Sequence, residues 1–268
     1  MLNKFYSIQP SARILLAAMV LLSAVSAIAQ STNVIPSRTF MYAVQPAMAI
    51  GTAVFAMRIA GGMQDRVHHR GDKAFLVGSV LAIWFVLYFL SGLMTTYVHN
   101  SLVGSLRGIL INVWSFGVVA YAIEYSRHII MLVVSRRNVI WFGAVVASVL
   151  AVQQMNFSTL AQAHDAVAFI KLCISGFIPA ILSSFLLTYL AITGGFAAML
   201  VYRLGLVAIT ILPPIIPKYD WYLQGVTLIL WGLPCLWRST ELVRTGKSAV
   251  IVIGIMHHAP TTSCHLSC

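Results

Sequence analysis

Long apolar runs separated by short polar connections dominate this chain. Each run holds roughly 20 residues, the length that a helix with a rise of about 1.5 Å per residue needs to cross a hydrocarbon core of about 30 Å. Runs of this kind lie around residues 14–29, 39–60, 74–98, 108–126, 138–155, 166–190, 194–216 and 220–237. The pattern predicts an all-α protein, a polytopic transmembrane helix bundle of about eight spans.

The first run has a second interpretation. Lys4 and Arg13 lie before the run. The string AIA at residues 27–29, before Gln30, is typical of a signal-peptidase cleavage site. Cleavage there would leave seven spans. We favour a retained helix, because the next run follows within ten residues and its helix needs a partner to pack against.

The composition agrees with a membrane protein. Of all residues, 60% are hydrophobic and 9% are charged, whereas about a quarter of the residues in a soluble domain are charged. Residues 1–237 therefore form one multi-span membrane domain whose main partner is the lipid bilayer. Residues 238–268 are a short C-terminal tail.

The net charge of +11 is unevenly distributed. With the N-terminus in the cytoplasm, the cytoplasmic segments would hold Lys4, Arg13, Arg58, Arg66, Arg70, Lys73, Arg127, Arg136, Arg137, Arg238, Arg244 and Lys247. The outer loops would hold only Arg38, Arg107 and Lys218. This bias predicts a multi-pass protein of the plasma membrane with both termini in the cytoplasm. No basic run is interleaved with aromatic residues, so we expect no nucleic-acid partner.

Three charged residues lie inside predicted spans. Arg203 follows Gly194 by nine residues, or about 13 Å of helix, and its side chain leans back toward the cytoplasmic end. Glu124 lies near the cytoplasmic end of an oppositely directed helix, so the two side chains can meet. They form either a structural ion pair that locks the bundle or a site for a substrate or an ion. Lys171 lies close to the end of its span and is interpreted as an interfacial anchor.

Catalytic and cofactor motifs do not occur in the chain. It has no HExxH, no GxSxG and no glycine-rich phosphate loop. Ser183 and Ser184 lie within a span and are expected to bond back to their own helix. We therefore expect no catalytic residue, no cofactor and no metal in the membrane domain.

The tail contains soft metal ligands. They are His257, His258, Cys264, His265 and Cys268. Their number would suffice for zinc or copper, but their spacing matches no standard zinc finger. Metal binding by the tail therefore stays open.

Several strings together resemble a known membrane region. They are LSGLMTTYVHNSLVGSLRGILINVW, EYSRHII, LLTYLAITGGFAAMLVYRLG and PPIIPKYDW, between about residues 90 and 221. In order and spacing they are similar to the multi-span region that precedes the peptidase domain in bacterial members of the archaeal or endoplasmic-reticulum type of signal peptidase I. The family-like positions are Gly194, Gly195, Tyr202, Arg203, Pro214, Pro217 and Trp221.

The resemblance implies a scaffold rather than an enzyme. In that family a serine peptidase domain with a Gly-Ser-Met-type element follows the membrane region. The string VIVIGIM in the tail is similar to that element, but Ile255 stands where the nucleophilic serine would be. We therefore expect a non-catalytic or truncated relative, with the tail a remnant of the start of a peptidase domain. Its partners would be other membrane proteins or a separate signal peptidase catalytic domain. The alternative is a small transporter or channel that uses Arg203 and Glu124.

Overall fold

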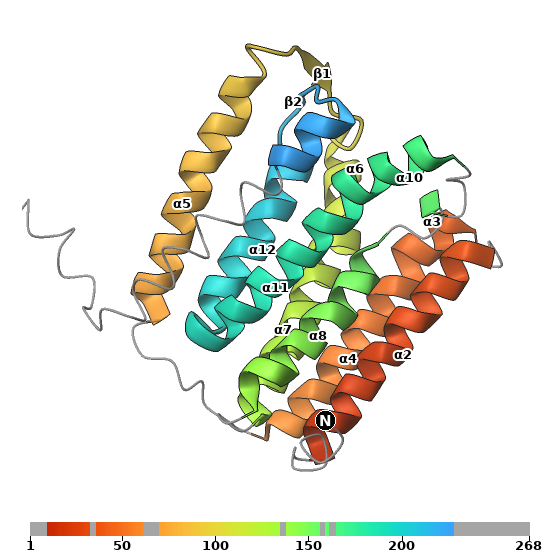
Figure 1. The fold of residues 1–268 in the computed structure, drawn as a ribbon, viewed down its shortest axis with the longest axis vertical. Coiled ribbons are helices and arrows are strands. Elements are labelled where there is room, and N and C mark those ends of the chain that lie inside the picture. Colours follow the sequence, from red (N-terminus) through yellow and green to blue (C-terminus); the bar gives the residue numbers. More distant parts are fainter. Residues whose placement is uncertain are drawn as a thin grey trace, which may run out of the picture.

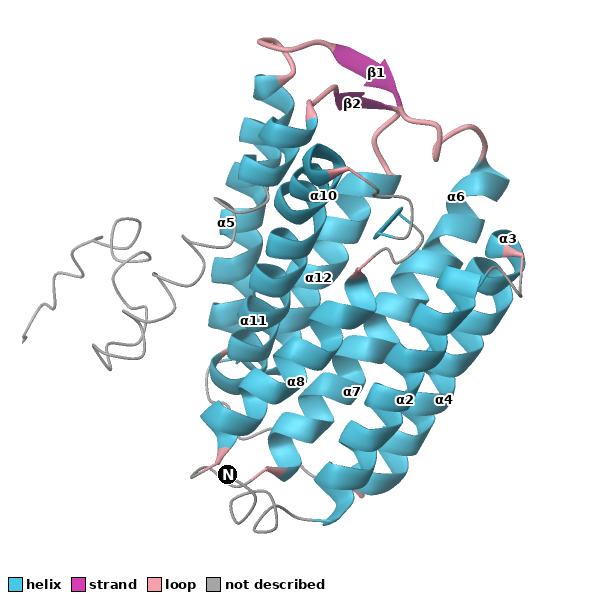
Figure 2. Ribbon diagram, turned by 45° about the vertical axis from the view of Figure 1, so that its right-hand side comes forward, coloured by secondary structure: helices cyan, strands magenta, loops and turns pink. Residues whose placement is uncertain are grey.

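The structure is a computed structural model, and it describes residues 10–32, 36–61, 70–134, 138–155, 159–160 and 165–227. Long helices run up and down between the two ends of the molecule (Figure 1, Figure 2). The elements are α2 (Pro10–Thr32), α3 (Ser37–Thr39), η1 (Phe40–Val44), α4 (Gln45–Ala60), α5 (Arg70–Ser91), β1 (Tyr97–His99), α6 (Leu106–Asn112), η2 (Val113–Val118), α7 (Val119–Val133), α8 (Val139–Gln154), α10 (Ala166–Leu172), η3 (Cys173–Phe177), α11 (Ile178–Thr193), α12 (Gly195–Ile211) and β2 (Ile215–Pro217). Residues 221–227 form a further helical stretch.

The helical bundle agrees with the apolar runs in the sequence. Among the described residues, five helices are long and apolar enough to cross a membrane: Pro10–Ala29, Phe40–Ala60, Gly71–Ser91, Leu106–Val133 and Ala166–Thr193. The helices α8 and α12 are apolar but shorter, with 16 and 17 residues. A helical membrane protein is thus confirmed, while the total of eight spans stays a prediction.

Three of the helices contain a π-helical segment. The segment η1 leads into α4, η2 joins α6 to α7, and η3 joins α10 to α11. The residues at each junction keep right-handed helical backbone angles, so each helix continues through its π turn. Residues 106–133 therefore form one 28-residue helix, which extends well beyond the expected end at residue 126.

The tight turn between α11 and α12 marks one end of the bundle, which we call the hairpin end. Gly195 has a φ of 78°, a left-handed conformation that favours glycine. A Cβ atom on Gly194 would come within 2.9 Å of the Cβ atom of Ala198. Both glycines are explained by the turn itself. At the same end, the Lys73 Nζ atom of α5 donates a hydrogen bond to the Thr193 carbonyl at 2.7 Å.

The other end carries a short β-ribbon, and we call it the ribbon end. The strands β1 and β2 pair antiparallel, with Tyr97 opposite Pro217 and His99 opposite Ile215. The predicted helix limits at residues 98 and 216 were wrong here, because α5 ends at Ser91 and α12 at Ile211. Prolines lack the N–H group that a helix interior requires, and residues 213 and 214 are both proline.

The core of the bundle lies where α11 packs against α8 and α12. Its fully buried side chains include Phe142 of α8, Leu186 and Leu187 of α11, and Tyr202 of α12. The helix α2 packs against α4, α7 and α8, as a retained first helix would. The helix α5 is peripheral and packs mainly on α12, where a Cβ atom on Gly205 would come within 1.8 Å of the Leu81 side chain.

Asn100 connects the β-ribbon to the end of α12. Its backbone N–H donates to the Pro214 carbonyl, and its Nδ2 atom donates to the carbonyls of Thr210 and Pro213, all at 2.9 Å. Its Oδ1 atom accepts a hydrogen bond from the backbone N–H of Leu102 at 3.1 Å. The side chain is only 3% exposed. One buried amide therefore satisfies carbonyls that the proline-terminated helix leaves without partners.

We expect Asn100→Ala to destabilise the protein by about 2 to 4 kcal/mol, because three side-chain hydrogen bonds are lost and buried carbonyls remain without donors. Thermal unfolding of the purified protein in detergent micelles measures the effect. The neighbouring substitution His99→Ala is the matched control, since His99 is exposed, and it should change stability little. Equal stability of the two variants would contradict this role of Asn100.

Candidate functional site

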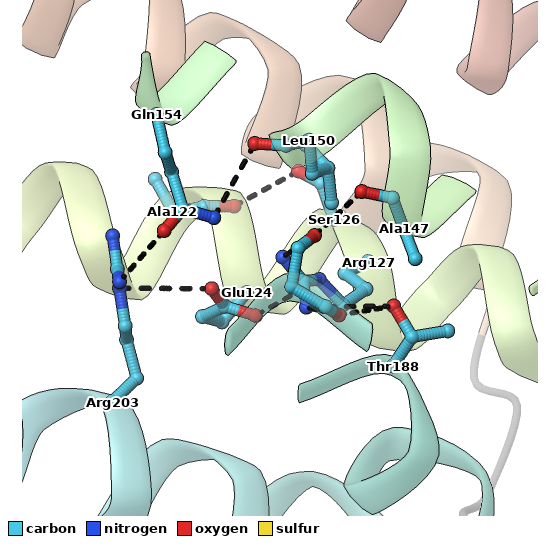
Figure 3. A network of polar contacts seen from close by, with 10 residues as sticks. Ala122, Glu124, Ser126, Arg127, Ala147, Leu150, Gln154, Thr188 and Arg203 are labelled. Atoms are coloured by element: carbon cyan, nitrogen blue, oxygen red, sulfur yellow. Dashed lines mark hydrogen bonds and ion pairs between the residues drawn. The ribbon is translucent and has the colours of Figure 1, made fainter. Parts of the chain in front are cut away.

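The two charged residues expected to meet do lie together in the bundle interior (Figure 3). The Arg203 Nε atom of α12 lies 3.8 Å from the Glu124 Oε1 atom of α7. The Glu124 side chain is 1% exposed and the Arg203 side chain 22%. A carboxylate buried to this degree requires a nearby cation, and here it has more than one.

Arg127 is the second cation, and its expected cytoplasmic position was wrong. Its side chain is fully buried, and its Nε atom lies 3.1 Å from the Glu124 Oε2 atom, one helical turn away along α7. The apolar run was expected to end at residue 126, but α7 continues to Val133. Residues 129–133 are all buried and follow Arg127 inside the bundle. Arg127 therefore belongs to the interior rather than to a loop.

The guanidinium of Arg127 also binds α11. Its Nη1 atom donates to the Ser184 carbonyl at 2.9 Å and approaches the Thr188 Oγ1 atom at 3.4 Å. Its Nη2 atom lies 3.5 Å from the Ser184 Oγ atom. The Ser184 hydroxyl donates to the Ala147 carbonyl of α8 at 2.7 Å, so the expectation that it bonds back to its own helix was wrong. One buried arginine thus joins α7 to α11, and Ser184 joins α11 to α8.

Arg203 also forms a hydrogen bond with a residue of α8. Its Nη1 atom donates to the Gln154 Oε1 atom at 3.2 Å, and the Gln154 Nε2 atom donates to the Leu150 carbonyl at 3.3 Å. Figure 3 shows dashed lines from the Arg203 guanidinium to both Glu124 and Gln154. The guanidinium therefore has protein partners on two different helices.

Glu124, Arg127, Arg203, Gln154, Ser184 and Thr188 form what we call the charge network. It contains one carboxylate and two guanidinium groups, so its net charge is +1 when all three are ionised. Removing such groups from water costs several kcal/mol for each ion, and only good geometry and further hydrogen bonds offset that cost. The carbonyl of Ser184 and the amide of Gln154 supply those hydrogen bonds. The arrangement fixes the depth and rotation of four helices relative to one another.

The other family-like positions lie along α12 and just beyond it. Tyr202 is 1% exposed and belongs to the core. The Pro214 carbonyl accepts the Asn100 backbone hydrogen bond, and Pro217 is a paired residue of β2. The Lys171 Nζ atom lies 5.9 Å from the centre of the Trp221 ring, a cation–π distance. Each of these residues has a packing role at its own position, and they do not converge on one site.

The other sequence-based candidates cannot be placed. Among the residues that the structure describes, no group of three or more His, Cys, Asp or Glu side chains could hold a metal ion. Ile255 and the histidines and cysteines of the tail lie outside the described residues.

In comparisons with protein-family models, with curated proteins and with solved structures, the chain matched none of them. The relation to signal peptidase I therefore rests on the sequence strings alone.

Local spacing could have indicated that Arg127 and Thr188 belong to this site. Glu124 and Arg127 are separated by three positions, and Ser184 and Thr188 by four, so each pair shares one helix face. The contact between the two faces could not be found in this way, because it depends on how α7 and α11 are rotated against each other.

The charge network predicts a specific order of stabilities. Arg203→Leu leaves Glu124 paired with Arg127, so we expect only a moderate loss. Glu124→Gln leaves two buried guanidinium groups without a carboxylate, and removing one partner of a buried pair costs about 3 to 5 kcal/mol. The double variant Glu124→Gln with Arg203→Leu should be more stable than Glu124→Gln alone, because one unpaired cation is removed with the carboxylate.

Thermal or denaturant unfolding of the wild type, the two single variants and the double variant in the same detergent micelles measures this order of stabilities. Arg107→Gln is the control, since Arg107 is an exposed cation at the ribbon end, and it should resemble the wild type. A double variant less stable than Glu124→Gln would contradict the proposed coupling between Glu124 and Arg203.

Proposed function

We propose that the protein is a non-catalytic integral membrane scaffold, similar to the membrane region of the archaeal or endoplasmic-reticulum type of signal peptidase I. The observation that carries the proposal is the position of Arg203. Its guanidinium is bound by Glu124 of α7 and by Gln154 of α8. Because its partners are protein groups on two other helices, the guanidinium links those helices, which supports a role in helix packing.

A scaffold of this kind acts through its partners. Other membrane proteins, or a separate signal peptidase catalytic domain, are the partners that the resemblance implies. A transport function through Arg203 and Glu124 is the competing proposal, favoured only by the 22% exposure of the arginine side chain. A transporter would lose its flux in the double variant of these two residues even where the protein remains folded.

The chain by itself should not cleave a signal-peptide substrate. The family-like element in the tail carries Ile255, which has no nucleophilic atom, where a serine is required. Incubation of the purified, membrane-reconstituted protein with a fluorogenic signal-peptide substrate measures the activity, with a complete signal peptidase of the same family as positive control. Cleavage that disappears when a serine of this chain is replaced would refute the proposal.

We propose further that the protein lies in the plasma membrane with its hairpin end toward the cytoplasm. The helix α4 ends and the helix α5 begins at that end, and these helix ends carry Arg58, Arg70 and Lys73. Basic residues are retained preferentially in cytoplasmic loops. Both termini would then be cytoplasmic.

Cysteine labelling tests this orientation. In a variant whose four native cysteines are replaced by serine, a single cysteine at Gln64 should resist an impermeant maleimide applied to intact cells. A single cysteine at Ser101, which is exposed at the ribbon end, is the matched control and should react. Strong labelling at position 64 with protection at position 101 would invert the orientation.

A further inference from the structure

A cavity of about 480 Å³ lies at the ribbon end, apart from the charge network. Its sides are the last turns of α5 and α12, and the β-ribbon and the helical stretch of residues 221–227 complete it. None of the charge-network residues lines it. The cavity is therefore a second feature that the scaffold role does not explain.

The deeper part of the cavity is apolar and aromatic. Trp84 and Tyr88 of α5 line one side, with ring centres 5.1 Å apart and nearly parallel. Leu206 and Ile209 of α12 line the opposite side. Trp84 lies seven residues before the end of α5 at Ser91, which places it about 10 Å from that end of the helix by helical rise. Aromatic side chains at this depth are typical of the membrane interface.

The upper part of the cavity carries one charge. Among the described residues that line the cavity, Lys218 is the only ionised side chain and none is acidic. Its backbone N–H donates to the Thr96 carbonyl at 2.8 Å, which holds the residue beside the β-ribbon, and the side chain is exposed. It forms no ion pair with any residue that the structure describes. The amide of Gln224 lines the same cavity and adds a neutral donor.

We propose that this cavity binds an anionic phospholipid, with the phosphate at Lys218 and the upper part of an acyl chain between α5 and α12. An acyl chain has no hydrogen-bonding group, so it can occupy the apolar walls without leaving a polar atom unsatisfied, which a peptide backbone could not do. The single unpaired cation and the absence of lining carboxylates favour an anionic headgroup over a zwitterionic one. The proposal requires the membrane location and does not depend on the scaffold role.

Quenching of Trp84 fluorescence by brominated lipids tests the proposal. The wild-type protein is placed in nanodiscs of phosphatidylcholine that contain increasing fractions of brominated phosphatidylglycerol or brominated phosphatidylcholine. Subtracting the signal of Trp84→Phe isolates the contribution of this residue from those of the other tryptophans. We expect the fraction of brominated phosphatidylglycerol that gives half-maximal quenching to be about fivefold lower than the corresponding fraction of brominated phosphatidylcholine. A factor of about five in affinity is what the attraction of one lysine to an anionic lipid provides.

Two exposed cations at the same end serve as variant and control. Lys218→Gln should abolish the difference between the two lipids, and Arg107→Gln, which does not line the cavity, should retain it. Equal quenching by both lipids in the wild type, a preference that survives Lys218→Gln, or a preference lost in both variants would overturn the proposal.

Further outcomes would also overturn it. Loss of the preference on addition of inorganic phosphate would assign the site to a free anion, and quenching relieved by an added apolar peptide would assign it to a peptide. A protein that does not enter nanodiscs at all would instead refute the membrane location, which separates the failure of that proposal from the failure of this one.

Discussion

Two guanidinium groups face one carboxylate in the interior of this bundle, and the arrangement of its central helices depends on that contact. Electrostatic interactions are much stronger in a medium of low dielectric constant than in water, so the buried Glu124 needs a cation within reach. Arg127 supplies one from α7 itself at 3.1 Å, and Arg203 supplies a second from α12 at 3.8 Å. The Arg127 guanidinium then connects α7 to α11 by its hydrogen bond to the Ser184 carbonyl. The Ser184 hydroxyl connects α11 to α8 by its hydrogen bond to the Ala147 carbonyl. Side-chain packing elsewhere in the core has to accommodate these positions.

The two ends of the bundle are held by different means. At the hairpin end the glycines permit a direct turn between α11 and α12, and Lys73 ties α5 to the end of α11. At the ribbon end the prolines stop α12, and Asn100 supplies the donors that its last carbonyls require. The peripheral helix α5 therefore has a polar anchor at its hairpin end and a close apolar contact with α12 at Gly205.

The family-like positions can be understood in these terms. Gly194 and Gly195 belong to the turn, Arg203 belongs to the charge network, and Pro214 and Pro217 belong to the ribbon. They occur in one stretch of sequence because α12 runs from one end of the bundle to the other. Their spacing thus reflects the length of a helix and the features at its two ends, and no catalytic step is needed to account for it.

The sequence by itself determined the class of protein and the positions of its long helices, because apolar runs of sufficient length leave a chain few other structures in lipid. It also indicated a meeting of Glu124 with Arg203, which follows from helical rise and direction. It could not show that Arg127 is buried, because the carbonyl and hydroxyl groups that bind its guanidinium come from α11. Likewise the β-ribbon pairs segments more than a hundred residues apart, and the cavity beneath it exists only where four separate segments meet. Contacts of this kind depend on the rotation of one helix against another, which only the tertiary structure decides.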